Sequence, residues 1–498
     1  MSEAAVLGID FGSLYWKAVV SRGSQNSIVC DEHGNRCLDA SVFFNDGEIV
    51  IGSSAAVLTK SFPNNVINHP MHYLDNRKCC SDCNSGVTTE MDGDYPVFCI
   101  PFTSGIERIS LEKVFIECFK RLFNLAVLTF NCDPIATVIS LPSDLSPKSQ
   151  EYVLSCAKAA GLPSVSLIPH HLACITALES SHEESKDASS SSEGIIVVVD
   201  LPANTASVSL VSSSNGFYKT VASQRLQVRV GEEITSCLFD YVMKEACRKL
   251  GSEVAHSKKA AKKLQHEVVL CKECLSSTMS SAIMIDSLFD GVDFTMNVTR
   301  ARLEMYAHAV AVKLQEQVKA VLAAHGVELT SIEKMVVVGG SALVPFVQEA
   351  LKPLSNGRLW ISPRPREVIA EGAALHGSMR EKSHLRKVLP KLQQVAFSIL
   401  LAVEEWKSVV VEKGVVLPFK KMTEGRVEGE KPVSDVIMLY EVNGEEKKCG
   451  ELHFNTDLCG KRLLMNCNGD QFSGIHITLF VFDGNKEVEK KEFCLRDE

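Results

Sequence analysis

Three short segments carry residues that suit phosphate chemistry, and each one follows an apolar pattern typical of a buried strand. Asp10 ends the apolar run Ala5–Ile9, and Asp200 ends the run Ile195–Val199. A turn and a second strand-like segment follow each acid, so the two segments resemble one duplicated hairpin in two facing lobes. The third segment is Gly339-Gly340-Ser341, which opens from a short valine-rich strand. Glycine lets a backbone N–H approach a phosphate or ribose, although a tight strand-to-helix turn explains the Gly-Gly pair equally well.

The elements around these segments predict an α/β architecture. Apolar runs alternate with helical patterns through the first three quarters of the chain, and continuous apolar runs indicate strands buried on both faces. We expect helices to begin after Ser110 and after Ser146, the second of them ending at Gly161. The range Ser180–Glu193 is rich in Ser, Glu and Asp, and is predicted to be an exposed loop.

The last quarter of the chain changes to strand patterns separated by turn signals. Val409–Val411, Val436–Val442 and Ile475–Phe482 read as strands, and Asn443-Gly444 reads as a hairpin turn. No long helical pattern follows the last strand. These features are typical of a small β-sandwich.

Composition and charge exclude several classes of protein. The chain has 498 residues, of which 45% are hydrophobic and 23% charged, so wholesale disorder is excluded. The net charge of −9 argues against direct binding to DNA, which needs clustered Lys and Arg. The amino terminus does not resemble a signal peptide, and no apolar run reaches the ~20 residues that span a bilayer. The 18 cysteines then read as reduced thiols, and we expect a cytoplasmic protein without a membrane partner.

The order of these motifs resembles the heat-shock protein 70 family, the DnaK-like chaperones of the actin and sugar-kinase superfamily. Gly8–Ser13 is similar to the family's first phosphate motif, and Gly291–Phe294 with Thr299–Arg302 is similar to a segment of its second lobe. Gly339–Ser341 and Gly372–Ala374 are similar to its adenosine motif and the helix after it. The resemblance implies a two-lobed actin-like nucleotide-binding domain over residues 1–383 and a truncated β-sandwich over residues 384–498.

Several positions depart from the family's pattern. The second phosphate loop is Gly-rich in the family but reads Asp200-Leu201-Pro202-Ala203-Asn204-Thr205 here, and His170 stands where the family has a catalytic Glu. Val66–Leu74 contains no Lys to contact the phosphates, and Leu343 stands where an Arg is expected. On the helix that contacts adenosine, an acid and an Arg are replaced by Val269 and Glu273.

These departures predict that ATP hydrolysis is lost, because phosphoryl transfer depends on positioned charges. No catalytic residue is assigned, and the chain is expected not to be an enzyme. The resemblance still implies weak binding of ATP, with Mg²⁺ only alongside bound ATP, and a side chain at Gly339 should block the adenosine. The residues it assigns to the nucleotide are Asp10, Gly12, Ser13, Asp200, Thr205, Lys272, Ser276, Gly339, Gly340 and Ser341.

Two cysteine pairs and a histidine pair could in principle bind a metal. They are Cys80 with Cys83, Cys271 with Cys274, and His170 with His171. Structural zinc sites usually place their two halves closer in sequence, and His170 is better explained as the replacement of a catalytic acid. No metal site is therefore predicted.

The family resemblance also implies partners and a role. In character the chain is similar to the atypical heat-shock protein 70 of the ribosome-associated complex, which has no helical lid. That likeness implies a stress-response chaperone or cochaperone that partners a J-domain protein near the ribosome. It would assist nascent chains together with a second, active heat-shock protein 70. The alternative is a self-sufficient, ATP-dependent peptide-binding chaperone.

Overall fold

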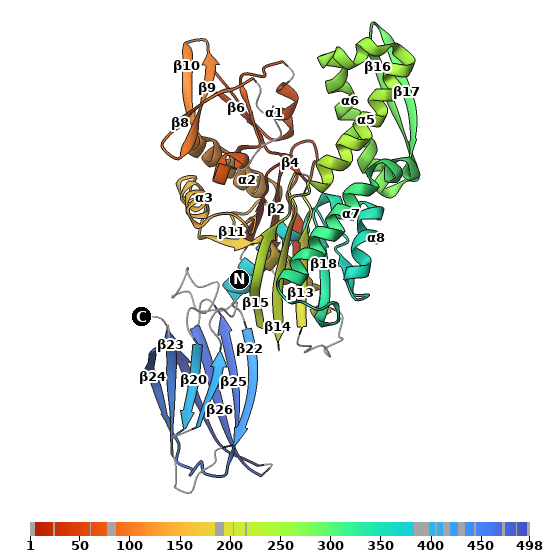
Figure 1. Cartoon of the computed structure of the whole chain (residues 1–498). Coiled ribbons are helices and arrows are strands. Elements are labelled where there is room, and N and C mark those ends of the chain that lie inside the picture. The colour runs from red at the N-terminus through yellow and green to blue at the C-terminus, as the bar shows by residue number, and fades with distance from the viewer. Residues whose placement is uncertain are drawn as a thin grey trace.

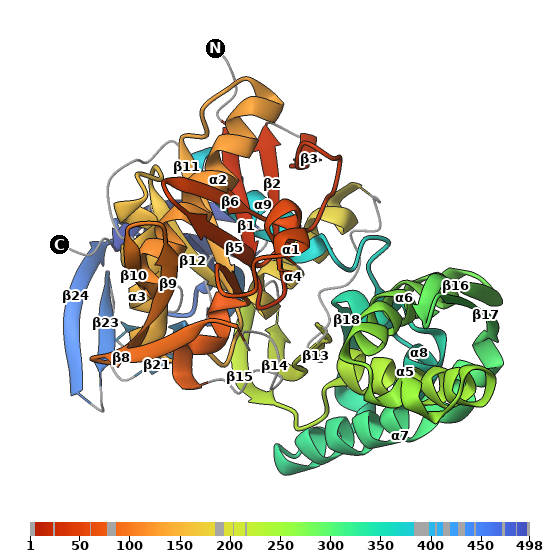
Figure 2. The same ribbon diagram turned by 90° about the horizontal axis from the view of Figure 1, so that it is seen from above.

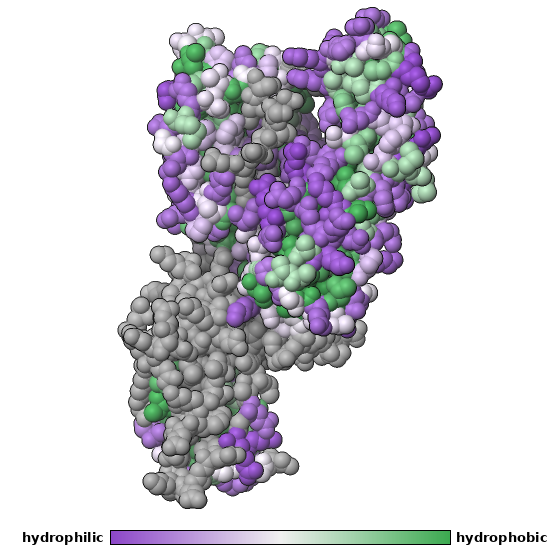
Figure 3. Space-filling model, in the orientation of Figure 1, coloured by the Kyte–Doolittle hydropathy of each residue, from purple (hydrophilic) through white to green (hydrophobic). Residues whose placement is uncertain are grey.

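The computed structural model shows two α/β lobes side by side and a group of antiparallel strands beneath them (Figure 1). It describes residues 5–22, 25–59, 61–76, 86–184, 194–202, 204–214, 217–382, 398–403, 406–411, 419–426, 434–442, 445–470, 474–484 and 486–495. None of the described helices combines the length and hydrophobicity that crossing a membrane requires. The surface of the second lobe that faces the viewer in Figure 3 is mostly hydrophilic.

The first lobe is built on a sheet in the order β12-β11-β1-β2-β3, with β4 paired to β2. Its strands are β1 (Ala5–Phe11), β2 (Tyr15–Arg22), β3 (Gln25–Ile28), β4 (Leu38–Asp39), β11 (Ala136–Leu141) and β12 (Val165–Pro169). Strand β1 runs antiparallel to β2 and parallel to β11. The helices of this lobe are α2 (Leu111–Phe130), α3 (Pro147–Ala159) and α4 (His170–Glu184). Every residue of β1 is buried, as its continuous apolar pattern predicts.

Two smaller sheets complete the first lobe. One has the order β6-β5-β7, and the other has the order β10-β9-β8. Their elements are β5 (Ser41–Asn45), β6 (Glu48–Ile51), α1 (Ser53–Leu58), β7 (Val66–Asn68), β8 (Thr88–Asp92), β9 (Tyr95–Phe102) and β10 (Gly105–Ser110). A 3-10 segment, Pro70–Asn76, follows β7.

The second lobe repeats the arrangement of the first around a sheet in the order β15-β14-β13-β18-β19. Its strands are β13 (Gly194–Asp200), β14 (Ser207–Ser214), β15 (Phe217–Arg225), β18 (Ile332–Val338) and β19 (Leu359–Ile361). Strand β13 runs antiparallel to β14 and parallel to β18, as β1 does with β2 and β11. The predicted duplication is therefore confirmed in the strand pairing.

The second lobe also contains helices and one hairpin. They are α5 (Val230–Leu250), α6 (Lys258–Ser277), β16 (Ser280–Phe289), β17 (Val292–Thr299), α7 (Arg300–Ala324) and α8 (Pro345–Leu351). Of these, β16, β17 and α6 lie away from the sheet at the top of Figure 1. Seen from above, α5 to α8 stand to one side of the first lobe (Figure 2).

The two lobes are joined by a shared apolar core around α4 and α9 (Val368–Lys382). That core contains Val6 from the first lobe and Val198 and Val336 from the second. The two helices approach so closely that a Cβ on Gly372 of α9 would lie 1.8 Å from the carbonyl oxygen of Ala173 on α4. Because the helices are locked in this way, the ends of β1 and β13 are held facing one another.

The C-terminal strands form two four-stranded antiparallel sheets, in the orders β21-β20-β23-β24 and β22-β25-β26-β27. They are β20 (Ser398–Val403), β21 (Trp406–Val411), β22 (Phe419–Arg426), β23 (Asp435–Val442), β24 (Glu445–His453), β25 (Arg462–Asp470), β26 (Gly474–Asp483) and β27 (Lys486–Leu495). The predicted class, an α/β core of two actin-like lobes followed by small antiparallel sheets of β-sandwich type, is confirmed.

Of the local predictions, the two helix caps are confirmed and one loop is partly wrong. Ser110 and Ser146 cap α2 and α3, each through its Oγ, which accepts from the backbone N–H three residues on. The predicted loop Ser180–Glu193 is wrong for its first part, because α4 continues to Glu184. The rest of that loop, the predicted turn at Asn443-Gly444 and the predicted domain boundary at 383/384 lie outside the described residues.

Candidate functional site

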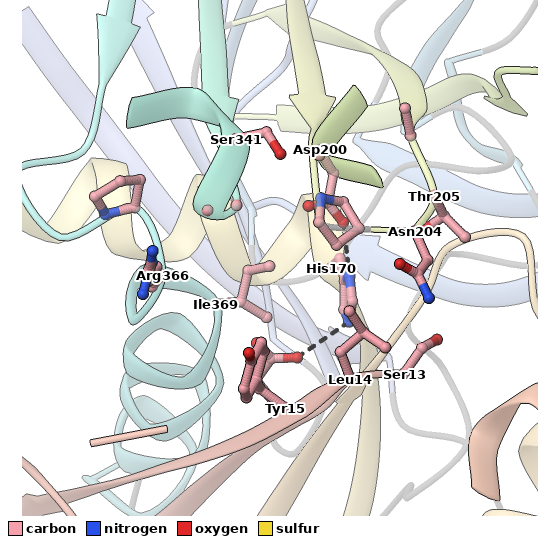
Figure 4. Close-up of a pocket in the computed structure, with 18 of the residues that line it drawn as sticks. Ser13, Leu14, Tyr15, His170, Asp200, Asn204, Thr205, Ser341, Arg366 and Ile369 are labelled. Atoms are coloured by element: carbon pink, nitrogen blue, oxygen red, sulfur yellow. Dashed lines mark hydrogen bonds and ion pairs between the residues drawn. The ribbon is translucent and has the colours of Figure 1, made fainter. Parts of the chain in front are cut away.

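A cavity of about 270 Å³ lies between the lobes, where β1, β13 and β18 end. All ten residues that the sequence assigned to a nucleotide line this one cavity, although they come from both lobes and are spread over most of the chain. Figure 4 shows His170 between Asp200 and the turn of Ser13 and Leu14, with Arg366 on the side opposite Thr205. The assignment of these residues to a ligand stays a prediction.

A row of alternating charges crosses the floor of the cavity. The Lys17 ammonium donates to Asp10, with 2.7 Å between Nζ and Oδ2. His170 Nδ1 donates to Asp200 Oδ2 at 2.8 Å, and His170 Nε2 lies 3.5 Å from Asp10 Oδ1. The side chains of Asp10 and His170 are only 2% and 7% exposed. Each carboxylate of this row is therefore already paired with a cationic or cation-forming side chain of this chain.

Lys17 is the site residue that the sequence analysis missed. The missing phosphate-contacting Lys was sought in Val66–Leu74, and no residue of that segment lines the cavity. The ammonium comes instead from β2, where Lys17 stands directly opposite Asp10 in the hairpin register. Opposite charges at facing positions of an antiparallel pair stabilise each other, so the hairpin register was the signal that could have found this pair.

The environments of the two adjacent histidines move their pKa values in opposite directions. Burial by itself would lower the pKa of His170, but the hydrogen bond and charge of Asp200 and the charge of Asp10 raise it above its ordinary value. Burial lowers the pKa of His171 to about 3. His171 lies with Nδ1 2.7 Å from Ser143 Oγ and Nε2 2.9 Å from Thr220 Oγ1. His170 therefore belongs to the cavity, whereas neutral His171 links the two lobes.

On the side where the resemblance places adenosine, a guanidinium is present after all. Arg366 lines the cavity and pairs with Glu273 at 2.9 Å. The family resemblance predicted an Arg at position 273 or 343, whereas this Arg lies in the loop before α9. Lys272 Nζ donates to the Gly231 carbonyl at 3.1 Å and to Thr235 Oγ1 at 2.7 Å. Burial lowers the pKa of Lys272 to about 8.

The Gly-Gly-Ser turn has a different role from the one that the sequence suggested. A Cβ on Gly339, where φ is +90°, would lie 2.4 Å from the Leu201 carbonyl oxygen, so backbone packing by itself excludes a side chain here. That such a side chain would also block adenosine stays a prediction. The N–H groups of Gly339 and Ser341 donate to the carbonyls of Pro365 and Leu201. At Gly340 the nearest atom to a Cβ would be Arg366 Nε at 3.5 Å. Gly339 is thus required for close packing on the end of β13, and Gly340 is the position that faces the cavity side chains.

The two cysteine pairs differ in how the structure describes them. Cys80 and Cys83 lie outside the described residues. Cys271 and Cys274 are both free thiols, the first buried in the core of the second lobe and the second exposed. In the parts of the chain that the structure describes, no three His, Cys, Asp or Glu side chains are grouped so as to hold a metal ion.

Two similar lobes that meet over a cavity with paired aspartates and a Gly-Gly-Ser turn define the actin-like class of nucleotide-binding folds. Comparison with known proteins narrows this class. The family described as "Hsp70 protein" matches residues 6–404, and the chain belongs to that family.

Its relatives are distant. The chain is 25% identical over 446 residues to heat shock cognate 70 kDa protein 3 of Dictyostelium discoideum, and the aligned region covers 87% of this chain and 70% of that protein. It is 25% identical over 380 residues to a ribosome-associated molecular chaperone of Saccharomyces cerevisiae, and the aligned region covers 75% of this chain and 61% of that protein. It is 24% identical over 468 residues to a heat shock 70 kDa protein of Emericella nidulans, which covers 92% of this chain and 71% of the relative.

Proposed function

We propose that this chain is a non-catalytic HSP70-family cochaperone of the cytoplasm. It binds adenine nucleotide weakly in the cavity between its lobes and does not hydrolyse it at a useful rate. Its two functional parts are residues 1–383, which hold the nucleotide, and residues 384–498, which form the sandwich. The observation that carries the proposal is the row formed by Lys17, Asp10, His170 and Asp200.

That row supports the loss of hydrolysis. Phosphoryl transfer needs positioned charges and a group that orients the attacking water. His170, at the position of the family's catalytic Glu, directs Nδ1 at Asp200 and lies with Nε2 toward Asp10. Because both ring nitrogens are directed at aspartates, neither is available to orient the attacking water as a carboxylate would. Losing two contributors of about 3 kcal/mol each slows the reaction by a factor of about 10⁴.

A protein of this family that does not cycle acts through its partners. HSP70 chaperones generally work with J-domain proteins. We propose that this chain is a stable partner of a J-domain protein, associated with ribosomes and nascent chains, and that it supports a second, active heat-shock protein 70. The likeness to a relative named as a ribosome-associated chaperone supports this placement. The alternative is a self-sufficient, ATP-dependent peptide-binding chaperone.

Two measurements on the full chain distinguish these functions. Phosphate release from ATP should stay at background with and without an added J-domain protein. Turnover that a J-domain protein stimulates would favour the alternative. Affinity purification from cytosol at moderate salt should recover a J-domain protein and ribosomes. A chain that runs as a lone monomer at every salt concentration and recovers neither would contradict the proposed partnership.

A further inference from the structure

The row of charges in the cavity already gives each of its two aspartates a basic partner. Lys17 comes from β2, Asp10 from β1, His170 from the first turn of α4 and Asp200 from the end of β13. The two aspartates face each other across the lobes, and the two basic side chains lie against them at 2.7 Å and 2.8 Å. The cavity therefore carries built-in positive charge that belongs to the fold.

HSP70 proteins typically bind ATP together with Mg²⁺, so the site can be tested for that ion. Mg²⁺ demands an octahedral shell of oxygens and keeps several of its waters. Here one oxygen of Asp10 is taken by Lys17 and one oxygen of Asp200 is taken by His170. A divalent cation would be left with the second oxygen of each carboxylate, and at Asp10 that oxygen already lies 3.5 Å from His170 Nε2. The cation would also stand beside the Lys17 ammonium. The residues present do not fit hydrated Mg²⁺.

The same residues suit a phosphate oxygen. The bond to Asp10 accounts for one of the three N–H donors of the Lys17 ammonium, and Lys17 lines the cavity. His170 Nε2 lies 3.5 Å from Asp10 Oδ1 but makes no hydrogen bond in the described part of the chain, and it too belongs to a cavity-lining side chain. Burial by itself would lower the pKa of Lys17, but the neighbouring Asp10 carboxylate raises it above its ordinary value, so the lysine stays charged.

We infer that this chain binds the phosphates of an adenine nucleotide directly through Lys17 and His170, without a divalent cation. The inference rests on the nucleotide binding proposed above and adds how the phosphate charge is met. In this arrangement the Lys17 ammonium, on the β1–β2 hairpin, supplies the positive charge that Mg²⁺ would otherwise supply. The preferred ligand is therefore free nucleotide and not the magnesium complex.

The test is calorimetric titration of the full chain with ATP and with ADP, once in excess Mg²⁺ and once in EDTA. We expect affinity in EDTA to equal or exceed affinity in Mg²⁺. Lys17→Met should weaken binding in EDTA by about 10- to 100-fold, the loss expected for one hydrogen bond to a charged group. It should also reverse the preference, because Asp10 is then available to a metal ion. Lys120→Met removes an exposed lysine of α2 and should change neither affinity.

Because Lys17→Met leaves Asp10 buried without its cation, the double variant Asp10→Asn/Lys17→Met is measured beside it. This variant carries no stranded charge, and it should still bind far more weakly in EDTA than the wild type. Binding that requires Mg²⁺ would overturn this inference and leave the proposed function standing. Unchanged affinity in both Lys17 variants would also overturn it. No binding under either condition would overturn both the inference and the proposed nucleotide site.

Discussion

Replacing Lys17 by methionine tests how strongly the buried ion pair holds the first lobe together. The two charged atoms lie 2.7 Å apart, and the Lys17 and Asp10 side chains are 15% and 2% exposed. At that 2.7 Å separation their attraction is about 6 kcal/mol for an effective dielectric constant of about 20. Much of this offsets the cost of removing both charges from water.

Removing only the lysine leaves the buried Asp10 carboxylate charged and without its cation, so the free-energy cost of burying that charge is no longer offset. Measured losses for breaking one side of a buried pair are about 3–5 kcal/mol. His170 Nε2 lies 3.5 Å from the other oxygen of Asp10 and can take up part of the charge, so the lower end applies. We expect Lys17→Met to lower the free energy of unfolding by about 3 kcal/mol.

A double-mutant cycle separates the pair from other effects of the substitution. On an Asp10→Asn background, Lys17→Met should cost only about 1 kcal/mol, because no buried charge is then stranded. The matched control is Lys120→Met, which breaks an ion pair with Glu117 of similar length, 2.9 Å, whose side chains are 46% and 23% exposed. That change should cost less than about 0.5 kcal/mol, as exposed pairs do.

The assay is urea unfolding followed by tryptophan fluorescence, since Trp16 is fully buried beside Lys17 and stacks on Phe11. Two single substitutions that are additive within about 0.5 kcal/mol would refute the coupling between Lys17 and Asp10. A loss from Lys17→Met no larger than the loss from Lys120→Met would refute it as well.

Three further changes have expected outcomes that thermal or chemical unfolding can check. Gly372→Ala places a Cβ 1.8 Å from the Ala173 carbonyl oxygen and should cost about 2–3 kcal/mol, whereas Gly340→Ala, with no neighbour nearer than 3.5 Å, should cost about 1 kcal/mol or less. Acidification below about pH 6.5 should destabilise the protein through His171 by up to about 1.4 kcal/mol per pH unit. His171 has a pKa of about 3 in the folded state, so between these pH values only the unfolded chain binds the proton. His171→Gln should reduce the slope of stability against pH. Ser110→Ala removes the N-cap of α2 and should cost about 1 kcal/mol, and an unchanged midpoint would contradict the capping role.

Elements whose causes are local could be predicted from the residues alone. The strand that ends at Asp10 is buried along its whole length, as its unbroken apolar run predicts. Ser110 and Ser146 cap helices because a hydroxyl reaches a backbone N–H only three residues away. The family resemblance placed ten residues, spread over most of the chain, and all of them line one cavity. Local patterns were sufficient for the strand and the caps, whereas the ten cavity residues came from the resemblance.

Which charges face one another in that cavity depends on how distant segments pack and could not be predicted from local patterns. Lys17 and Arg366 bring positive charge into the cavity, one from a neighbouring strand and the other from a loop before α9. A side chain at Gly339 would meet the Leu201 carbonyl just after β13, because β13 and β18 are neighbouring parallel strands of one sheet. Charge pairs and close contacts of this kind join residues that are distant in sequence, and the shared core of α4 and α9 sets their separation. No local pattern carries that distance, because it is fixed by the packing of both lobes together.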